Sequence, residues 1–323
     1  MHLLIPFAAC SEPQAQELMV GLLRDRKLPQ LQRLLARLRP VQRDSGAVDS
    51  LSPPHERVLA RLLGLQANDG LIPWAARQNQ QDWPSDASAA WGWITPCHWQ
   101  VGRDQMQMDP PDALDLQEDE SRDLLAAMQA YFEEDGIHLI YVSPVSWLGR
   151  SALFKNLASA SLDRVIGHDP ADWLPRGPDA ALLRRLQNEM QMLLYTHPVN
   201  ERRVERGLTP VNSFWLSGSG ALSTACPDAD LTETISPLLP RSLANAALRQ
   251  DWPAWAAAWQ QLDAGPCQAL WGALQQNGGP ERCVLTLCGE RNAQTYGATG
   301  NPWLARAQHF FTRSRLAQQL ESL

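Results

Sequence analysis

The sequence lacks the cysteine spacing of a zinc site. It holds six cysteines, and no two of them form a C-x-x-C pair; they are Cys10, Cys97, Cys226, Cys267, Cys283 and Cys288. No His or Cys pair follows Cys283 and Cys288 to complete a tetrahedral ligand set, so a structural zinc site is excluded. We therefore expect buried, free thiols in a reducing cytoplasm.

Long apolar runs are also missing. No stretch reaches the length that a membrane-spanning helix needs, so we expect no membrane partner. The first ten residues, MHLLIPFAAC, contain no Lys or Arg before their apolar part, which argues against a signal peptide. They favour a buried first strand over residues 2–8 in a soluble, cytoplasmic protein.

An excess of positive charge is absent as well. The chain has 28 basic and 35 acidic residues and a net charge of −7, so nucleic acid is not the expected partner, although a local basic patch remains compatible with this balance. Aromatic residues are unevenly distributed, with thirteen tryptophans against six phenylalanines and four tyrosines. Most of these tryptophans are expected in the core, and some of them could line a pocket.

Short apolar strands alternate along the chain with amphipathic helices, which predicts a single α/β domain over 1–323 with a mixed sheet flanked by helices. A subdivision is expected near the acidic, proline-containing loop 103–120. The predicted strands cover 2–8, 91–102, 137–144, 211–217 and 283–289. The predicted helices cover two segments of 13–38 separated by Pro29, then 52–63, 121–134, 181–195, 241–248, 253–262, 266–276 and 303–321.

One stretch, HPVNERRVERGLTPVNSFWLSGSG at 197–220, combines arginines, amides and glycines. Arg202, Arg203 and Arg206 can form a cationic cluster, because residues three or four apart share a helix face. Arginine binds carboxylate or phosphate through two parallel hydrogen bonds, and a Ser-Gly-Ser-Gly turn can direct backbone N–H groups at an anion. Surface pairing of the arginines with Glu201 and Glu205, and a plain turn at SGSG, explain the same residues without a ligand.

The order of residues in this stretch resembles a motif of archaeal-type, cofactor-independent phosphoglycerate mutases. The matching positions are His197, Pro198, Val199, Asn200, Arg203, Gly207, Pro210, Asn212, Trp215, Gly218 and Gly220. The stretches SPPHERVLARLLGL, SLDRVIG, LQNEMQMLLYTHPVN and VNSFWLSGSG also resemble a bacterial group of mutase-like proteins labelled regulatory protein of RpfE type. The resemblance implies a reduced relative of the alkaline phosphatase superfamily fold.

The catalytic parts implied by this resemblance are not matched. The mutases use a serine phosphoryl carrier and two metal ions held by Asp and His, whereas the first strand here ends IPFAAC, without an acid. Asp163, His168 and Asp169 are the weak candidates for metal ligands. We therefore expect a catalytically degenerate protein, without a cofactor, that binds a small anionic metabolite. A regulatory role, exerted through a protein partner, is compatible with this expectation. The expected ligand-binding residues are Asn200, Arg202, Arg203, Arg206, Asn212, Trp215, Ser217, Ser219 and Arg164.

Two other functions remain open at this point. One is an active mutase or phosphotransferase that uses a divalent metal held by rearranged ligands. The other is an interaction or scaffold protein without a small ligand, which uses exposed tryptophans and the acidic loop 103–120. In the scaffold alternative the arginines are paired with acids and no open cavity lies beside them.

Overall fold

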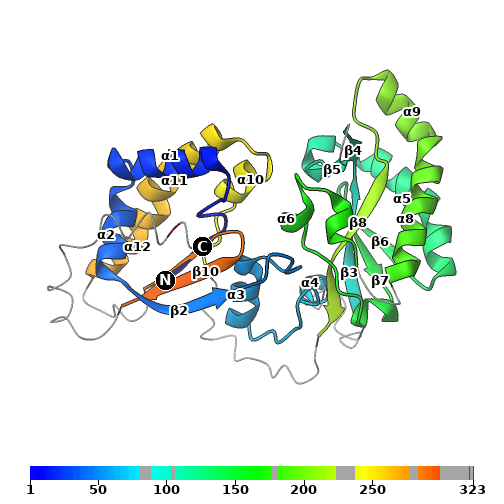
Figure 1. The fold of residues 1–323 in the computed structure, drawn as a ribbon. Helices are drawn as coiled ribbons and strands as arrows, with labels where there is room; N and C mark the ends of the chain where they lie inside the picture. Colours follow the sequence, from blue (N-terminus) through cyan, green and yellow to red (C-terminus); the bar gives the residue numbers. More distant parts are fainter. Residues whose placement is uncertain are drawn as a thin grey trace. The chain divides into compact units, whose positions relative to one another are not determined.

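The computed structural model describes residues 1–79, 89–102, 106–175, 180–222, 237–276 and 283–298, together with residues 320 and 323. The chain divides into two compact units (Figure 1). Unit 1 comprises Met1–Val48, Pro53–Leu63 and Asp230–Leu323, and unit 2 comprises Asp49–Ser52 and Gly64–Ala229. The range 103–120, where a subdivision was expected, lies inside unit 2.

Unit 1 contains a four-stranded mixed sheet in the order β1-β9-β10-β2. Strand β1 (His2–Ile5) pairs in parallel with β9 (Val284–Cys288), and β10 (Asn292–Gly297) runs antiparallel to both β9 and β2 (Arg39–Ser45). The strands expected in 2–8 and 283–289 are confirmed. Strands β2 and β10 were missed, because β2 is mostly exposed and contains Pro40, and the sequence of β10 is largely polar.

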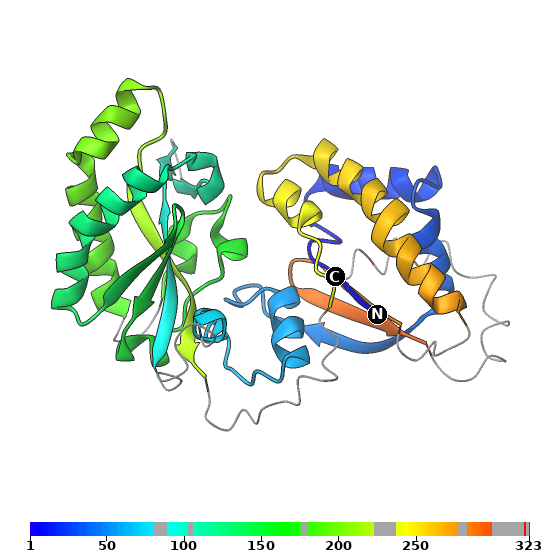
Figure 2. The same cartoon turned by 180° about the vertical axis from the view of Figure 1, so that it is seen from behind.

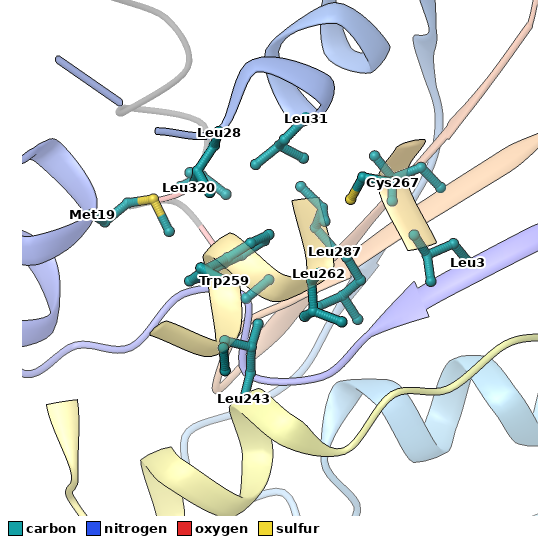
Figure 3. Close-up of a cluster of buried hydrophobic side chains, with 14 of the residues drawn as sticks. Leu3, Met19, Leu28, Leu31, Leu243, Trp259, Leu262, Cys267, Leu287 and Leu320 are labelled. Atoms are coloured by element: carbon teal, nitrogen blue, oxygen red, sulfur yellow. The ribbon is translucent and has the colours of Figure 1, made fainter. Parts of the chain in front are cut away.

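Helices cover both faces of this sheet (Figure 2). One face packs against α1 (Pro13–Arg24), α2 (Pro29–Arg37), α10 (Ser242–Leu248), α11 (Trp252–Leu262) and α12 (Gln268–Gln275). Figure 3 shows part of this core, in which Leu3 and Leu287 of the sheet meet Leu31, Trp259 and Leu262 of the helices. The other face contacts α3 (Pro54–Leu62) through Val58. The expected break at Pro29 is confirmed, whereas the helix expected at 303–321 lies almost entirely outside the described residues.

A buried histidine in β1 makes unit 1 sensitive to acid. His2 Nε2 lies 2.9 Å from Thr286 Oγ1, which lies 3.0 Å from Thr295 Oγ1. Burial, followed by the charge of the N-terminal amine, lowers the pKa of His2 to about 4. Between this value and its ordinary value near 6.5, the unfolded chain binds a proton that the folded chain does not bind. The free energy of unfolding should therefore fall as the pH drops through this window.

We expect His2→Gln to remove this part of the acid sensitivity. From pH 6.5 to pH 4 the wild-type chain should lose up to about 3 kcal/mol more stability than the variant does. Urea denaturation at a series of pH values measures the difference, and His138→Gln, which changes a largely exposed histidine, is the matched control. If the free energy of unfolding depended on pH equally in His2→Gln and in the wild type, the expected role of His2 would be contradicted.

Unit 2 contains an antiparallel sheet in the order β6-β7-β3-β8 and a separate hairpin. The sheet strands are β6 (His138–Ser143), β7 (Ser146–Arg150), β3 (Ala90–Cys97) and β8 (Ser213–Ala221), and the hairpin pairs β4 (Trp99–Val101) with β5 (Met106–Met108). Strand β3 contains Pro96, although it lies between β7 and β8. The proline is tolerated because β7 pairs with β3 only as far as Ile94.

Helices also cover both faces of this second sheet. The long helices α5 (Glu118–Glu134) and α8 (Ala180–Tyr195) pack their apolar sides on Phe214 and Leu216 of β8. The short helix α4 (Trp74–Asn79) packs on the opposite side, where Ala75 and Ala76 meet Trp91 of β3. The expected α/β class, with sheets flanked by helices, is therefore confirmed. No helix among the described residues is both long and apolar enough to cross a membrane.

Candidate functional site

The site built by residues 197–220 centres on helix α9 (Pro198–Glu205). His197 caps its start, since Nδ1 accepts a hydrogen bond from the Val199 N–H at 3.3 Å, and Pro198 occupies the first helical position. Burial, more than any other cause, lowers the pKa of His197, which favours the neutral ring that this cap requires. At the other end Gly207 adopts a φ of 73° while the Leu208 N–H donates to the Arg203 carbonyl, which forms a Schellman cap.

Arg203 is completely buried and uses every nitrogen of its guanidinium within the protein. Nε donates to the Thr209 carbonyl at 3.0 Å, and the two terminal nitrogens donate to Glu120 Oε2 and to the Leu114 carbonyl. Glu120 lies in the first turn of α5 and also accepts a hydrogen bond from the Gln117 N–H at 3.2 Å. The arginine therefore connects the start of α5 to the turn after α9.

The two asparagines of the stretch also connect separate segments. Asn200 Nδ2 donates to the carbonyls of Leu194, at 2.8 Å, and Val211, at 2.6 Å, while its Oδ1 accepts from the Val211 N–H at 2.9 Å. Asn212 bonds both the N–H and the carbonyl of Trp99, at 2.8 Å and 3.0 Å. Asn200 thus ties α8 to the start of β8, and Asn212 ties that start to β4.

The expected Ser-Gly-Ser-Gly turn is instead the second half of strand β8, which is a correction to the sequence interpretation. Ser219 Oγ donates to the Leu157 carbonyl at 2.6 Å, and Trp215 Nε1 donates to the Ala160 carbonyl at 2.9 Å. Ser217 is buried in the same strand. The glycines let α4 and the residues before it approach, because a Cβ on Gly218 would lie 3.2 Å from Trp74 Cβ and one on Gly220 would lie 2.9 Å from the Leu71 carbonyl oxygen.

Gly220→Ala is expected to lower the free energy of unfolding by about 3 kcal/mol, because it combines a positive φ of 151° with a backbone clash. Gly207→Ala is the matched control. Its φ is 73°, but no atom lies within 4 Å of the added Cβ, so the cost should be about 1 kcal/mol. Chemical denaturation measures both variants. Equal losses in the free energy of unfolding would show that the close approach of the Leu71 carbonyl does not add to the cost of Gly220→Ala.

The remaining expected ligand residues differ in exposure. Arg202 and Arg206 are more than half exposed, at 56% and 58%, and they face Asp123 at 3.7 Å and Glu120 at 3.1 Å. The acids that pair with the arginines are thus Asp123 and Glu120 of α5, and not Glu201 and Glu205, which the explanation without a ligand had named. Arg164 lies buried in α6 (Leu162–Val165), with its guanidinium 5.7 Å from the centre of the Trp173 ring.

The three weak metal candidates do not converge on one point. Asp163 is buried in α6, and His168 Nδ1 lies 3.1 Å from the Ile166 carbonyl. Asp169 caps α7 (Pro170–Trp173) by accepting from the Ala171 N–H at 2.9 Å. In the part of the chain that the structure describes, no group of three or more His, Cys, Asp or Glu residues could hold a metal ion. These residues therefore do not fit the two-metal site that a phosphoglycerate mutase requires.

Glu120 is the site residue that the sequence interpretation missed. The local sequence indicates only that Glu120 helps to begin α5, where it forms a capping box with Gln117. Nothing in the local sequence indicates that a residue 83 positions later will use the same carboxylate.

Comparisons with known proteins find similarity over part of the chain. No family model matches. A 56-residue segment is 46% identical to the 2,3-bisphosphoglycerate-independent phosphoglycerate mutase of Methanothrix thermoacetophila, and segments of the same length are 39% and 41% identical to the mutase of Methanosarcina acetivorans and to the probable mutase of Geobacter sulfurreducens. Each match covers 17% of this chain and 14% of the relative, so the similarity spans only a small part of either protein.

Two solved structures also align with this chain, at low sequence identity and with TM-scores below 0.5. A cofactor-independent phosphoglycerate mutase from Thermoplasma acidophilum is 11% identical and has a TM-score of 0.35, over 99% of this chain and all of the other. A protein from Pyrococcus horikoshii is 11% identical with a TM-score of 0.36, over 85% of this chain and 81% of the other. The segment matches in sequence confirm that part of this chain is similar to the cofactor-independent phosphoglycerate mutases.

Proposed function

We propose that this chain is a phosphoglycerate-mutase-like protein that acts by binding and does not transfer phosphoryl groups. The observation that carries the proposal is that no group of three or more His, Cys, Asp or Glu residues among the described residues could hold a metal ion, while His168 and Asp169 bond local backbone groups. The absence of an acid after β1, where the chain continues Pro6-Phe7-Ala8, supports it further. Phosphoryl transfer through two metal ions needs carboxylates and imidazoles that converge on both oxygens of the displacement.

A binding role at the 197–220 stretch rests on its exposed arginines. Arg203 has its nitrogens bonded to Glu120, Leu114 and Thr209, so a metabolite would have to displace one of these acceptors to reach it. Arg202 and Arg206 are the residues left for a small anion, and both already lie near carboxylates. This arrangement favours a protein partner over the expected metabolite, and a regulatory role of the RpfE type stays a prediction.

A direct assay separates the proposal from an active mutase. Purified chain should not interconvert 3- and 2-phosphoglycerate in the presence of manganese, and calorimetric titration with manganese should show no stoichiometric binding. Manganese-dependent turnover that disappears in Asp163→Asn or His168→Gln would contradict the proposal and favour rearranged metal ligands. The Arg184→Ala variant, which changes an exposed residue of α8, controls for unrelated losses.

A further inference from the structure

A second charged surface lies in unit 1, whereas the stretch 197–220 belongs to unit 2. Residues 24–39 hold six of the 28 basic residues of the chain and one of its 35 acidic residues. We call the six the basic edge; they are Arg24, Arg26, Lys27, Arg33, Arg37 and Arg39. The last turn of α1, helix α2 and the start of β2 follow one another along one end of unit 1 and carry these residues (Figure 1).

The basic edge faces solvent. Five of its six side chains are exposed and Arg39 is partly buried. Arg24 pairs with Asp25 at 3.0 Å, but its side chain is still 76% exposed. The next acid along the chain, Asp44, is occupied by Arg57 and Arg61 of α3. The positive charge of this surface is therefore not balanced by acids from neighbouring positions in the sequence.

Helix stability accounts for only part of this charge. Arg24 and Arg37 lie in the last turns of α1 and α2, where a positive charge interacts favourably with the helix dipole. Arg26 follows α1 with a φ of 55°, in a Schellman cap where glycine is the more favourable residue. Arg33 lies in the middle of α2, where the helix dipole does not favour a positive charge, and it donates to Gln30 Oε1 at 3.4 Å. The helix dipole therefore accounts for neither of these two cations.

The residues around the basic edge limit the kind of partner that this surface can bind. Pro40 and a register shift interrupt β2 on the edge of the sheet, so this edge is poorly suited to pairing with an added strand. Residues 24–39 contain no aromatic side chain on which the bases of a single strand could stack. Outside this range lie 34 of the 35 acidic and 22 of the 28 basic residues, so a long polyanion would meet a net negative protein beyond the basic edge.

We propose that the basic edge binds a short acidic segment of a partner protein, through Arg26, Lys27, Arg33 and Arg37. Guanidinium groups bind carboxylates through paired hydrogen bonds, and a short segment contacts the basic edge alone. Exposed ion pairs are individually weak, so several together give weak binding that salt reverses. This inference is independent of the proposed function, because it uses no residue of unit 2.

The test uses the full chain and a fluorescently labelled oligoglutamate peptide at low ionic strength. We expect binding by fluorescence anisotropy, reversal by added salt, and a loss of about tenfold in affinity in the double variant Arg33→Glu/Arg37→Glu. The matched control, Lys155→Glu/Arg184→Glu, makes the same charge change on exposed residues of unit 2 and should bind nearly as tightly as the wild type.

A further variant separates binding from folding. Arg26→Gly removes one charge but relieves the positive φ, so it should weaken oligoglutamate binding while the free energy of unfolding stays equal or rises. Equal weakening in the unit 2 control, or no binding of oligoglutamate by the wild type, would overturn the proposal. Tighter binding of duplex DNA or of phosphatidylserine vesicles through the same residues would overturn it in favour of a phosphate-bearing partner.

Discussion

Arg203→Ala is expected to lower the free energy of unfolding by about 3–5 kcal/mol, because it leaves the buried Glu120 carboxylate without its main partner. The substitution also removes the donors to the Leu114 and Thr209 carbonyls. Urea denaturation measures the loss. If the main task of Arg203 were to contact a ligand, the protein without ligand would be nearly as stable after the substitution as before it.

Two further variants test whether the loss of stability comes from the buried hydrogen bonds of Arg203. Arg203→Lys keeps the charge but cannot supply three directed nitrogens, so it should still cost about 2 kcal/mol. Arg202→Ala, on the exposed side of the same helix, should cost less than about 0.5 kcal/mol. A similar loss for Arg202→Ala and Arg203→Ala would contradict the assignment, because it would point to a general effect of charge on α9.

Asn200→Ala should lower the free energy of unfolding by about 3 kcal/mol. The side chain satisfies three buried backbone groups, namely the carbonyls of Leu194 and Val211 and the N–H of Val211. Each buried group left without a partner costs about 1–3 kcal/mol, and these costs overlap when the groups are neighbours. The same denaturation experiment measures the loss.

The isosteric variant Asn200→Asp tests the direction of these bonds. A carboxylate has the shape of the amide but cannot donate to the two carbonyls, so this variant should be about as unstable as Asn200→Ala. Asn156→Ala changes an exposed asparagine of unit 2 and should stay within about 0.5 kcal/mol of the wild type. Retention of full stability in Asn200→Asp would show that the amide donors are not needed.

The longer helices of this fold could be predicted, because their signals are local, whereas the short helices α4, α6, α7 and α9 were not predicted. Leucines at helical spacing and the position of Pro29 define α1 and α2, and the apolar stripe over 181–195 defines α8. Strands β2 and β10 could not be found in this way. Their residues are mostly polar or exposed, and their pairing joins positions about 250 residues apart.

The sequence predicted Asn200, Arg203 and Asn212 as ligand-binding residues, and this role stays a prediction. In the structure each of the three side chains donates to a backbone carbonyl. Their acceptors are backbone carbonyls and Glu120, which no local pattern connects to them. A motif shared with an enzyme therefore indicates shared residues, and the fold decides whether these residues face a ligand or each other.

In the SGSG segment, too, the local sequence alone does not determine the role of the glycines. A Gly-Ser repeat favours a turn when it is considered alone, because glycine readily adopts a positive φ. Here Gly218 and Gly220 do adopt positive φ values, but within strand β8, where the absence of a Cβ makes room for Trp74 and for the carbonyl of Leu71. Only the packing of α4 and of the preceding residues on this strand distinguishes the two explanations.

A crystal structure of the chain grown with 3-phosphoglycerate and manganese tests the central claim most directly, namely that Arg203 holds the fold together and does not contact a ligand. The account predicts that Arg203 stays bonded to Glu120, Leu114 and Thr209, as it is in the present structure. It also predicts no manganese bound jointly by Asp163, His168 and Asp169. An Arg203 guanidinium turned away from Glu120 and bonded to the phosphate or carboxylate of the metabolite would contradict it.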